Sequence, residues 1–133
     1  MPLRAVETGT AVVACTTCRR PDVPRTETPD GARLIAALEA VQAREPRYAN
    51  VLVQAMPCLF ACKDGCTVHL RSPGKVGYVL GRFEPDEAAA DAILDYAVHY
   101  AASEIGQVPY KQWPAGVKGH FLTRTPPEGF VVE

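Results

Sequence analysis

The sequence predicts an α/β (α+β) fold in which a mixed four-stranded sheet carries two main helices, in the order β-α-β-β-β-α. Three observations favour it. Two β-branched apolar stretches lie on either side of an amphipathic helix, two more flank a tight turn, and a second helix follows them. At 133 residues, 47% of them hydrophobic, the chain is long enough to bury a core, so we expect a single domain over residues 1–133.

The first strand is predicted within "TAVVA", residues 10–14, and it ends where Cys15 begins. The loop that follows, "RRPDVPRTETPD", contains three prolines and cannot continue a helix or a central strand. Asp30 is expected to be the N-cap of "GARLIAALEAVQARE", where apolar residues recur at helical spacing. The second strand is predicted at residues 50–56, "NVLVQAM".

The next two strands, "CTVHLR" and "VGYVLGRF", flank "SPGK", a tetrad with proline and glycine at its central positions, and so form a hairpin. A second helix is expected from the acidic, proline-containing segment 84–87 to about Ser103. The tail, residues 104–133, is rich in proline and glycine and lacks periodicity. We expect it to wrap over the core, about residues 10–103, as an extended segment anchored by Trp113 and Phe121.

The topology places the cysteines together. A strand-helix-strand unit is nearly always a right-handed crossover between parallel strands, and the hairpin adds antiparallel strands, which is a thioredoxin-like arrangement. The two cysteine groups, Cys15-x-x-Cys18 and Cys58-x3-Cys62-x3-Cys66, each follow one of the parallel strands. They should therefore meet at one edge of the sheet.

Composition excludes several classes of function. The net charge of −1, with acidic and basic residues interspersed, supplies no field for binding nucleic acid. There is no apolar leader and no run of membrane-spanning length, so we expect a cytoplasmic protein without a membrane partner. A reducing compartment and an odd number of cysteines disfavour structural disulfides, which leaves metal or redox chemistry.

Three kinds of thiol site are considered. A Cys-x-x-Cys after a strand suggests a thioredoxin-type dithiol, but three prolines delay the helix to Asp30, so its dipole is not expected to be directed at Cys15. Zinc would accept four thiolates, although the second group contains no Cys-x-x-Cys. A [2Fe–2S] cluster needs two thiolates on each iron, converging from shielded loops, and two pairs at neighbouring strand ends meet that need. Five cysteines in two tight groups are not typical of simple burial.

The stretch "CLFACKDGCTVHL" resembles the thioredoxin-like [2Fe–2S] ferredoxins and the related small subunit of respiratory NADH dehydrogenases. In that family the second ligand pair is a Cys-x3-Cys with leucine after its first cysteine, followed by a hairpin and a terminal helix. The resemblance covers roughly residues 10–103. It implies that Cys15 and Cys18 bind one iron and that Cys58 and Cys62 bind the other.

The sequence departs from this family in two ways. The first pair is spaced more tightly than is usual there, and Cys66 is an additional thiol. Cys66 could replace Cys62 as a ligand, bind a further metal, or be the first residue of the third strand, and we favour the last. Pro57 occupies the place of the cis-proline of thioredoxin folds, and the sequence leaves its isomer open.

The chain is also similar to a bacterial family of small predicted metal-binding proteins that are often encoded near genes for cobalamin biosynthesis, a likeness that extends through the tail. The predicted function is thus that of a non-enzymatic [2Fe–2S] electron carrier. The family context implies a protein redox partner, such as a reductase or an enzyme of cobalt or corrin metabolism, and points to a homodimer. The alternatives are a thiolate protein that binds or delivers zinc, copper or cobalt, and a dithiol oxidoreductase.

Residues beside the cysteines have predicted secondary roles. Arg19, Arg20 and Lys63 could stabilise thiolates, contact an acidic partner, or be ordinary solvated loop residues. Leu59, Phe60 and nearby backbone N–H groups are expected to tune the reduction potential through burial and hydrogen bonds to sulfur.

Overall fold

A computed structural model describes residues 2–19, 22, 24 and 27–133, with only the backbone of Cys62. The main elements in chain order are β1 (Ala11–Cys15), α1 (Asp30–Arg44), β2 (Leu52–Met56), β3 (Val68–Arg71), β4 (Gly77–Leu80), α2 (Glu87–Ala102) and β5 (Phe121–Thr125). Short 3-10 turns lie at Pro46–Tyr48, Cys62–Asp64, Tyr110–Gln112 and Ala115–Val117.

The strands form one mixed sheet in the order β2-β1-β3-β4-β5. β1 and β2 are parallel, whereas the β1–β3, β3–β4 and β4–β5 pairs are antiparallel. The prediction of four strands is therefore wrong by one. The fifth, β5, comes from the tail, which adds an edge strand to β4 and does not simply cross the core in extended form.

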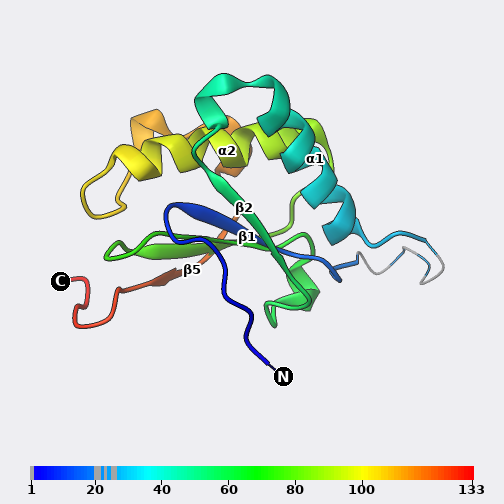
Figure 1. The fold of residues 1–133 in the computed structure, drawn as a ribbon, viewed down its shortest axis with the longest axis horizontal. Helices are drawn as coiled ribbons and strands as arrows, with labels where there is room; N and C mark the ends of the chain where they lie inside the picture. The colour runs from blue at the N-terminus through cyan, green and yellow to red at the C-terminus, as the bar shows by residue number, and fades with distance from the viewer. Residues whose placement is uncertain (1, 20–21, 23, 25–26) are drawn as a thin grey trace.

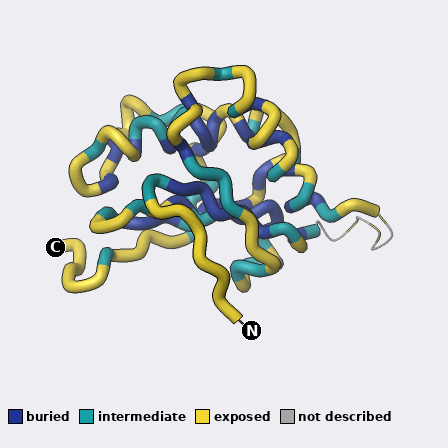
Figure 2. The backbone as a smooth tube through the Cα atoms, in the orientation of Figure 1, coloured by how far each residue is buried: buried dark blue, intermediate teal, exposed yellow. Residues whose placement is uncertain are grey.

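Both helices lie on the same face of this sheet (Figure 1). Val12, Leu70 and Tyr78 are opposite one another across β1, β3 and β4, so their side chains share the face that packs against the helices. Leu38 of α1 and Leu94 of α2 are both fully buried there. Figure 2 shows this burial of the sheet. β1 is buried along its whole length, whereas the N-terminal and C-terminal segments are exposed.

The predicted and observed starts of the first helix differ by one residue. Asp30 is the first residue of α1, and Pro29 stands in the N-cap position that we assigned to Asp30. The buried Asp30 carboxylate forms an ion pair with Arg33 at 3.4 Å. Asp86 caps α2, since its carboxylate accepts a hydrogen bond from the backbone N–H of Ala89 at 2.9 Å.

An aromatic cluster attaches the tail to the core. Trp113 and Phe121 are partly buried, and their ring centroids are 4.7 Å apart. Both rings pack against Tyr96 of α2, and Phe121 also contacts Tyr78 of β4. The predicted anchors are confirmed. None of the helices in the described residues combines the length and the apolar character required to cross a bilayer.

Candidate metal centre

The parallel pair β1–β2 brings the two cysteine groups together. Cys15 is opposite Met56 at the ends of these strands, and the backbone N–H of Thr16 donates to the Met56 carbonyl at 2.9 Å. The Cys15 Sγ lies 3.6 Å from the carbonyl oxygen of Pro57. The predicted proximity of Cys15 to the start of the second group is therefore observed. No described peptide bond is cis, so the bond before Pro57 is trans.

Cys15 and Cys18 form a buried thiol pair, with 1% and 2% of their surface exposed. Burial acts to raise the pKa of Cys15, but hydrogen bonds with Cys18, with Thr17 and with the Leu59 backbone outweigh it, and the pKa is lowered. The pKa of Cys18 is raised, first by burial and then by its hydrogen bond with Cys15, against the opposing effect of Thr67. The pair therefore holds a proton on Cys18 more readily than on Cys15.

The first turn of α1 lies against the loop between these cysteines. The Gly31 N–H donates to the Cys18 carbonyl at 2.9 Å, and a Cβ added to Gly31 would stand 2.0 Å from the carbonyl oxygen of Cys15. We did not expect the helix dipole to be directed at Cys15, yet the start of the helix lies against the loop that contains it. The proline-containing loop separates Cys18 from Asp30 in sequence but returns the chain to the cysteines, so the positive end of the helix dipole lies beside them.

The second cysteine group has a more open environment. The half-buried Cys58 accepts a hydrogen bond at its Sγ from the backbone N–H of Phe60, at 3.3 Å. Cys62 begins a short 3-10 turn, and its side chain lies outside the described part of the structure. Phe60 is 94% exposed and has a left-handed backbone, φ 59°, so the expected tuning by burial of this ring is wrong. Leu59 is half-buried and contributes through its backbone N–H.

Cys66 lies in the core and not in a strand. It is 1% exposed, has φ 39°, and precedes the first residue of β3, Val68. The interpretation of Cys66 as the first residue of the third strand is therefore wrong, because its left-handed backbone is incompatible with a strand.

Thr67, which the sequence pattern did not single out, links the first cysteine group to β3. Its buried side-chain Oγ1 lies 3.3 Å from the Cys18 Sγ, and its carbonyl accepts a hydrogen bond from the Cys15 N–H at 3.1 Å. Its hydroxyl stabilises the Cys18 thiolate relative to the thiol. The sequence signal available for it was its place beside a cysteine at the start of a strand that pairs with β1.

Arg82, also not predicted, ties the second cysteine loop to the rest of the fold. Its guanidinium donates to the Asp64 carboxylate at 3.1 Å and to the Gly119 carbonyl at 2.8 Å, and its backbone N–H donates to the Gly65 carbonyl at 2.9 Å. Its backbone is left-handed, with φ 64°. No sequence pattern marks this position, because the contacts join three segments that are far apart in the chain.

The predicted basic residues differ in their surroundings. Arg19 donates to the carbonyls of Pro24 and Glu27 within its own loop. Lys63 is exposed, and Arg20 lies outside the described residues.

The potential metal ligands near the strand ends are cysteine sulfurs. Hydrogen bonds from backbone N–H groups reach the Cys15 and Cys58 sulfurs, and a hydroxyl reaches Cys18, as suits thiolate ligands of a soft metal centre. Within the described side chains, which exclude that of Cys62, no three Cys, His, Asp or Glu residues are already grouped for metal binding. In its chemistry, the donor set fits an iron–sulfur cluster, for which Cys58 would complete the set together with Cys62.

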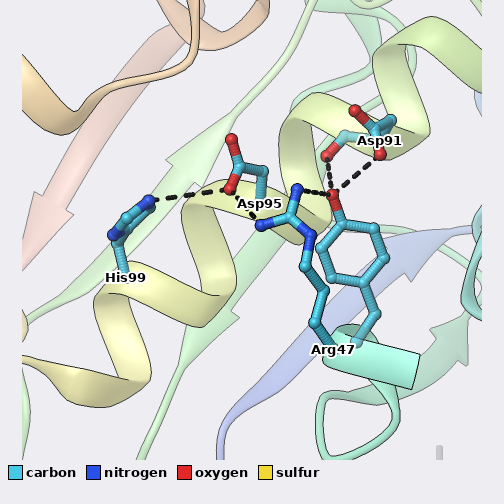
Figure 3. A network of polar contacts seen from close by, with 5 residues as sticks. Arg47, Asp91, Asp95 and His99 are labelled. Carbon is cyan, nitrogen blue, oxygen red and sulfur yellow. Dashed lines mark hydrogen bonds and ion pairs between the residues drawn. The ribbon is translucent and has the colours of Figure 1, made fainter. Parts of the chain in front are cut away.

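A separate polar network links the turn before β2 to α2 (Figure 3). The Tyr48 hydroxyl donates to the Asp91 carboxylate at 2.7 Å and accepts from Arg47 at 2.6 Å. Arg47 also pairs with Asp95 at 2.9 Å, and Asp95 lies 3.6 Å from the His99 ring. Because the guanidinium lies between these acceptors, the network joins two elements and offers no metal site.

Comparisons with known proteins agree with this fold. Residues 12–127 match the model of a family described as "Protein of unknown function (DUF1636)", and no curated protein matches the chain. The chain is similar to a solved structure of a thioredoxin-like [2Fe-2S] ferredoxin from Aquifex aeolicus, with TM-score 0.56 and 17% identity over 94% of this chain and 100% of that chain. A second structure of the wild-type ferredoxin gives TM-score 0.52 and 18% identity over 80% and 96%. At this identity the likeness shows a thioredoxin-like α/β fold.

Proposed function

The chain belongs to the DUF1636 family, and from its fold and its converging cysteines we propose that it binds a [2Fe–2S] cluster and carries single electrons. The observation that carries this proposal is the meeting of Cys15 with the start of the second cysteine group, 3.6 Å from the Pro57 carbonyl. The name of the similar ferredoxin supports the same cluster type.

In the proposed site, Cys15 and Cys18 hold one iron while Cys58 and Cys62 hold the other. A [2Fe–2S] cluster supplies a one-electron couple whose potential depends on hydrogen bonds to sulfur and on exposure to water. The chain's own contribution is to keep Cys15 and Cys18 away from water and to direct donors at their sulfurs. Thr67 serves Cys18 in this way, and the Leu59 N–H serves Cys15.

The electron partner that we propose is a protein, either a reductase or an enzyme of cobalt or corrin metabolism. The loop around Cys58 would face it, because Phe60 is 94% exposed there and the first thiol pair is buried. Electron transfer through the exposed loop requires no opening of the core.

The test is to purify the protein without oxygen and to measure iron, acid-labile sulfide and visible absorption before and after dithionite. We expect iron and sulfide in equal amounts, bleaching on reduction and a rhombic electron paramagnetic resonance signal. Cys18→Ser and Cys58→Ser should abolish or strongly alter the signal, whereas the matched Cys66→Ser variant should keep it. A colourless protein with zinc, or with no metal, would contradict the proposal and favour metal binding or delivery.

A specific observation favours dithiol chemistry as a second candidate. The Cys15 and Cys18 thiols hydrogen-bond to each other, their pKa values are shifted in opposite directions, and α1 begins beside them. Oxidation of the pair would form one S–S bond and pass two electrons and two protons to a disulfide such as oxidised glutathione.

This second candidate makes a separate prediction. Incubation of metal-free protein in glutathione redox buffers should remove two hydrogen masses reversibly, and Cys15→Ser should prevent the change. If the purified protein contains the cluster and its ligand variants lose it, the dithiol is not the working form of the site.

A further inference from the structure

A pocket of about 380 Å³ lies between β4, β5 and the segment that follows α2. Its lining residues are Tyr78, Gln107, Val108, Pro109, Trp113 and Arg124. None of these residues is a cysteine or a neighbour of one in sequence. The pocket is therefore distinct from the candidate metal centre, and a ligand bound in it would be independent of the proposed function.

Two side chains that line this pocket, Tyr78 and Arg124, have hydrogen-bond donors available for a ligand. Tyr78 and Arg124 are directly opposite each other in the β4–β5 pair, so their side chains lie on the same face of the sheet. Tyr78 is only 9% exposed, yet its hydroxyl has no hydrogen-bond partner among the described residues. Arg124 forms no ion pair with any residue that the structure describes. Every fully buried polar side-chain atom of the described residues has a partner, so the Tyr78 hydroxyl is reached through the pocket.

The chemistry of these two groups selects an anion. Burial raises the pKa of Tyr78 despite the opposing charge of Arg124, so the hydroxyl stays protonated at neutral pH and donates a hydrogen bond. The guanidinium is a permanent cation whose parallel N–H groups match a carboxylate.

Apart from the polar side chain of Gln107, the remaining lining residues, Val108, Pro109 and Trp113, are apolar. The indole N–H of Trp113 donates to the Val108 carbonyl at 2.8 Å, which fixes the ring against the segment that contains Pro109. Trp113 also packs on Phe121, with 4.7 Å between ring centroids. A ring held in this way presents a rigid surface to a planar molecule.

We propose that this pocket binds a small carboxylate with a flat apolar body. The carboxylate accepts hydrogen bonds from the Tyr78 hydroxyl and the Arg124 guanidinium. The body lies beside the Trp113 ring and the side chains of Val108 and Pro109. The volume lies within the usual range for small-molecule sites, which combine apolar walls with a few converging polar groups.

The chain offers its own reporter, because Trp113 is its only tryptophan. The full-length protein would be titrated with benzoate, with the neutral isostere benzamide, and with inorganic phosphate as an anion that has no apolar body. Trp113 fluorescence and the single indole N–H resonance would be recorded. We expect saturable changes with benzoate, and binding of benzamide and of phosphate that is weaker by about tenfold or more.

Two variants and one control locate the site. Arg124→Gln and Tyr78→Phe should each weaken benzoate binding by about tenfold while leaving the melting temperature nearly unchanged, since Arg124 is exposed and phenylalanine keeps the packed ring. Arg71→Gln is the matched control, because Arg71 donates to Gln54 on β2 and does not line the pocket. Its benzoate affinity should equal that of the parent protein.

Three results would overturn the inference. The first is the absence of saturable binding of benzoate in either signal. The second is benzoate affinity that is unchanged in Arg124→Gln and in Tyr78→Phe, which would place the ligand elsewhere. The third is equal affinity for benzoate and benzamide, or for benzoate and phosphate, which would remove the requirement for a charge or for an apolar body.

Discussion

The Cα of Gly31 packs directly against the backbone of Cys15, so that a Cβ at this position would lie 2.0 Å from the Cys15 carbonyl oxygen. The contact is between two backbone segments, neither of which can rotate away. It places the first turn of α1 at the Cys15–Cys18 loop and makes the geometry of that loop dependent on the absence of a side chain at Gly31.

Gly31→Ala should therefore destabilise the fold by about 2–4 kcal/mol, because either the helix start or the cysteine loop must move. Urea unfolding measures the change. Gly74→Ala is a suitable control, since a Cβ there meets nothing within 4 Å and bears only the cost of a left-handed backbone, about 1 kcal/mol. Equal losses in the two variants would contradict the importance of the Gly31–Cys15 contact.

Thr67→Val should remove the hydroxyl that lies 3.3 Å from the Cys18 sulfur. We expect a loss of about 1 kcal/mol in the free energy of unfolding and a further rise in the pKa of Cys18, because the thiolate loses a donor. Thiolate absorbance of the reduced, metal-free protein as a function of pH measures this shift. Thr67→Ser keeps the hydroxyl and should stay close to the parent; if it behaves like Thr67→Val, packing and not the hydrogen bond is responsible.

Replacing Arg82 should loosen the second cysteine loop. Arg82→Asn tolerates the left-handed backbone but cannot keep both the Asp64 and the Gly119 contacts, so we expect about 1 kcal/mol of destabilisation. Iron bound per chain after anaerobic reconstitution should fall more than this change in stability explains. Arg71→Gln, remote from the loop, should retain its iron, and full retention by Arg82→Asn as well would show that the loop holds its shape without Arg82.

Tyr48→Phe tests the network between the turn before β2 and α2. The ring of Tyr48 is fully buried and lies under the Arg47 guanidinium, 4.5 Å from the ring centroid, and phenylalanine keeps both features. The variant loses the hydroxyl that hydrogen-bonds to Asp91 and Arg47, so we expect a loss of about 1–2 kcal/mol in the free energy of unfolding. Tyr110→Phe, at a residue 63% exposed, should stay within about 0.5 kcal/mol of the parent. Thermal unfolding of the parent, of Tyr48→Phe, of Asp91→Asn and of the double variant would show whether the hydroxyl and the carboxylate act together.

The stability of the fold should fall as His69 becomes protonated. Burial first, and then the charge of Arg71, lower the pKa of His69 below its ordinary value of 6.5, so the folded state prefers the neutral ring. The unfolded chain then binds more protons than the folded chain as pH drops below 6.5, and the free energy of unfolding decreases through that window. Because carboxylates titrate at lower pH in both proteins, the measured quantity is the difference between the parent and His69→Gln. As the pH falls from about 7 to about 5.5, the free energy of unfolding should decrease more in the parent than in His69→Gln. A difference that stays constant with pH would contradict the role of His69.

The strands and helices predicted from local patterns were largely observed, but β5 was not predicted. The short β-branched apolar run in β1 and the helical spacing in α1 are properties of contiguous residues, so they are readable from the sequence. In β5 the apolar signal is limited to Phe121 and Leu122, within a tail rich in proline and glycine. Its strand conformation depends on pairing with β4 and on packing of Phe121 against Tyr78, which are contacts distant in sequence.

The candidate site likewise has one feature that the sequence predicts and others that depend on contacts between distant residues. The proximity of Cys15 to the second cysteine group follows from the rule that parallel strands end at a common edge, and it was predicted. The return of Gly31 to Cys15, the hydroxyl of Thr67 at Cys18, and the guanidinium of Arg82 each depend on the path of a loop. Loop paths are determined by long-range contacts, so a single sequence does not reveal them.

The interior position of β1 in the sheet also has a consequence for synthesis on the ribosome. β1 emerges first, yet both of its neighbours in the sheet, β2 and β3, lie later in the chain. The native surroundings of Cys15 and Cys18, including the Thr67 hydroxyl, cannot form until the nascent chain extends to Arg71 at the end of β3. The thiols made earliest are thus enclosed only after translation has passed the middle of the chain, so until then they are exposed to solvent and to oxidants.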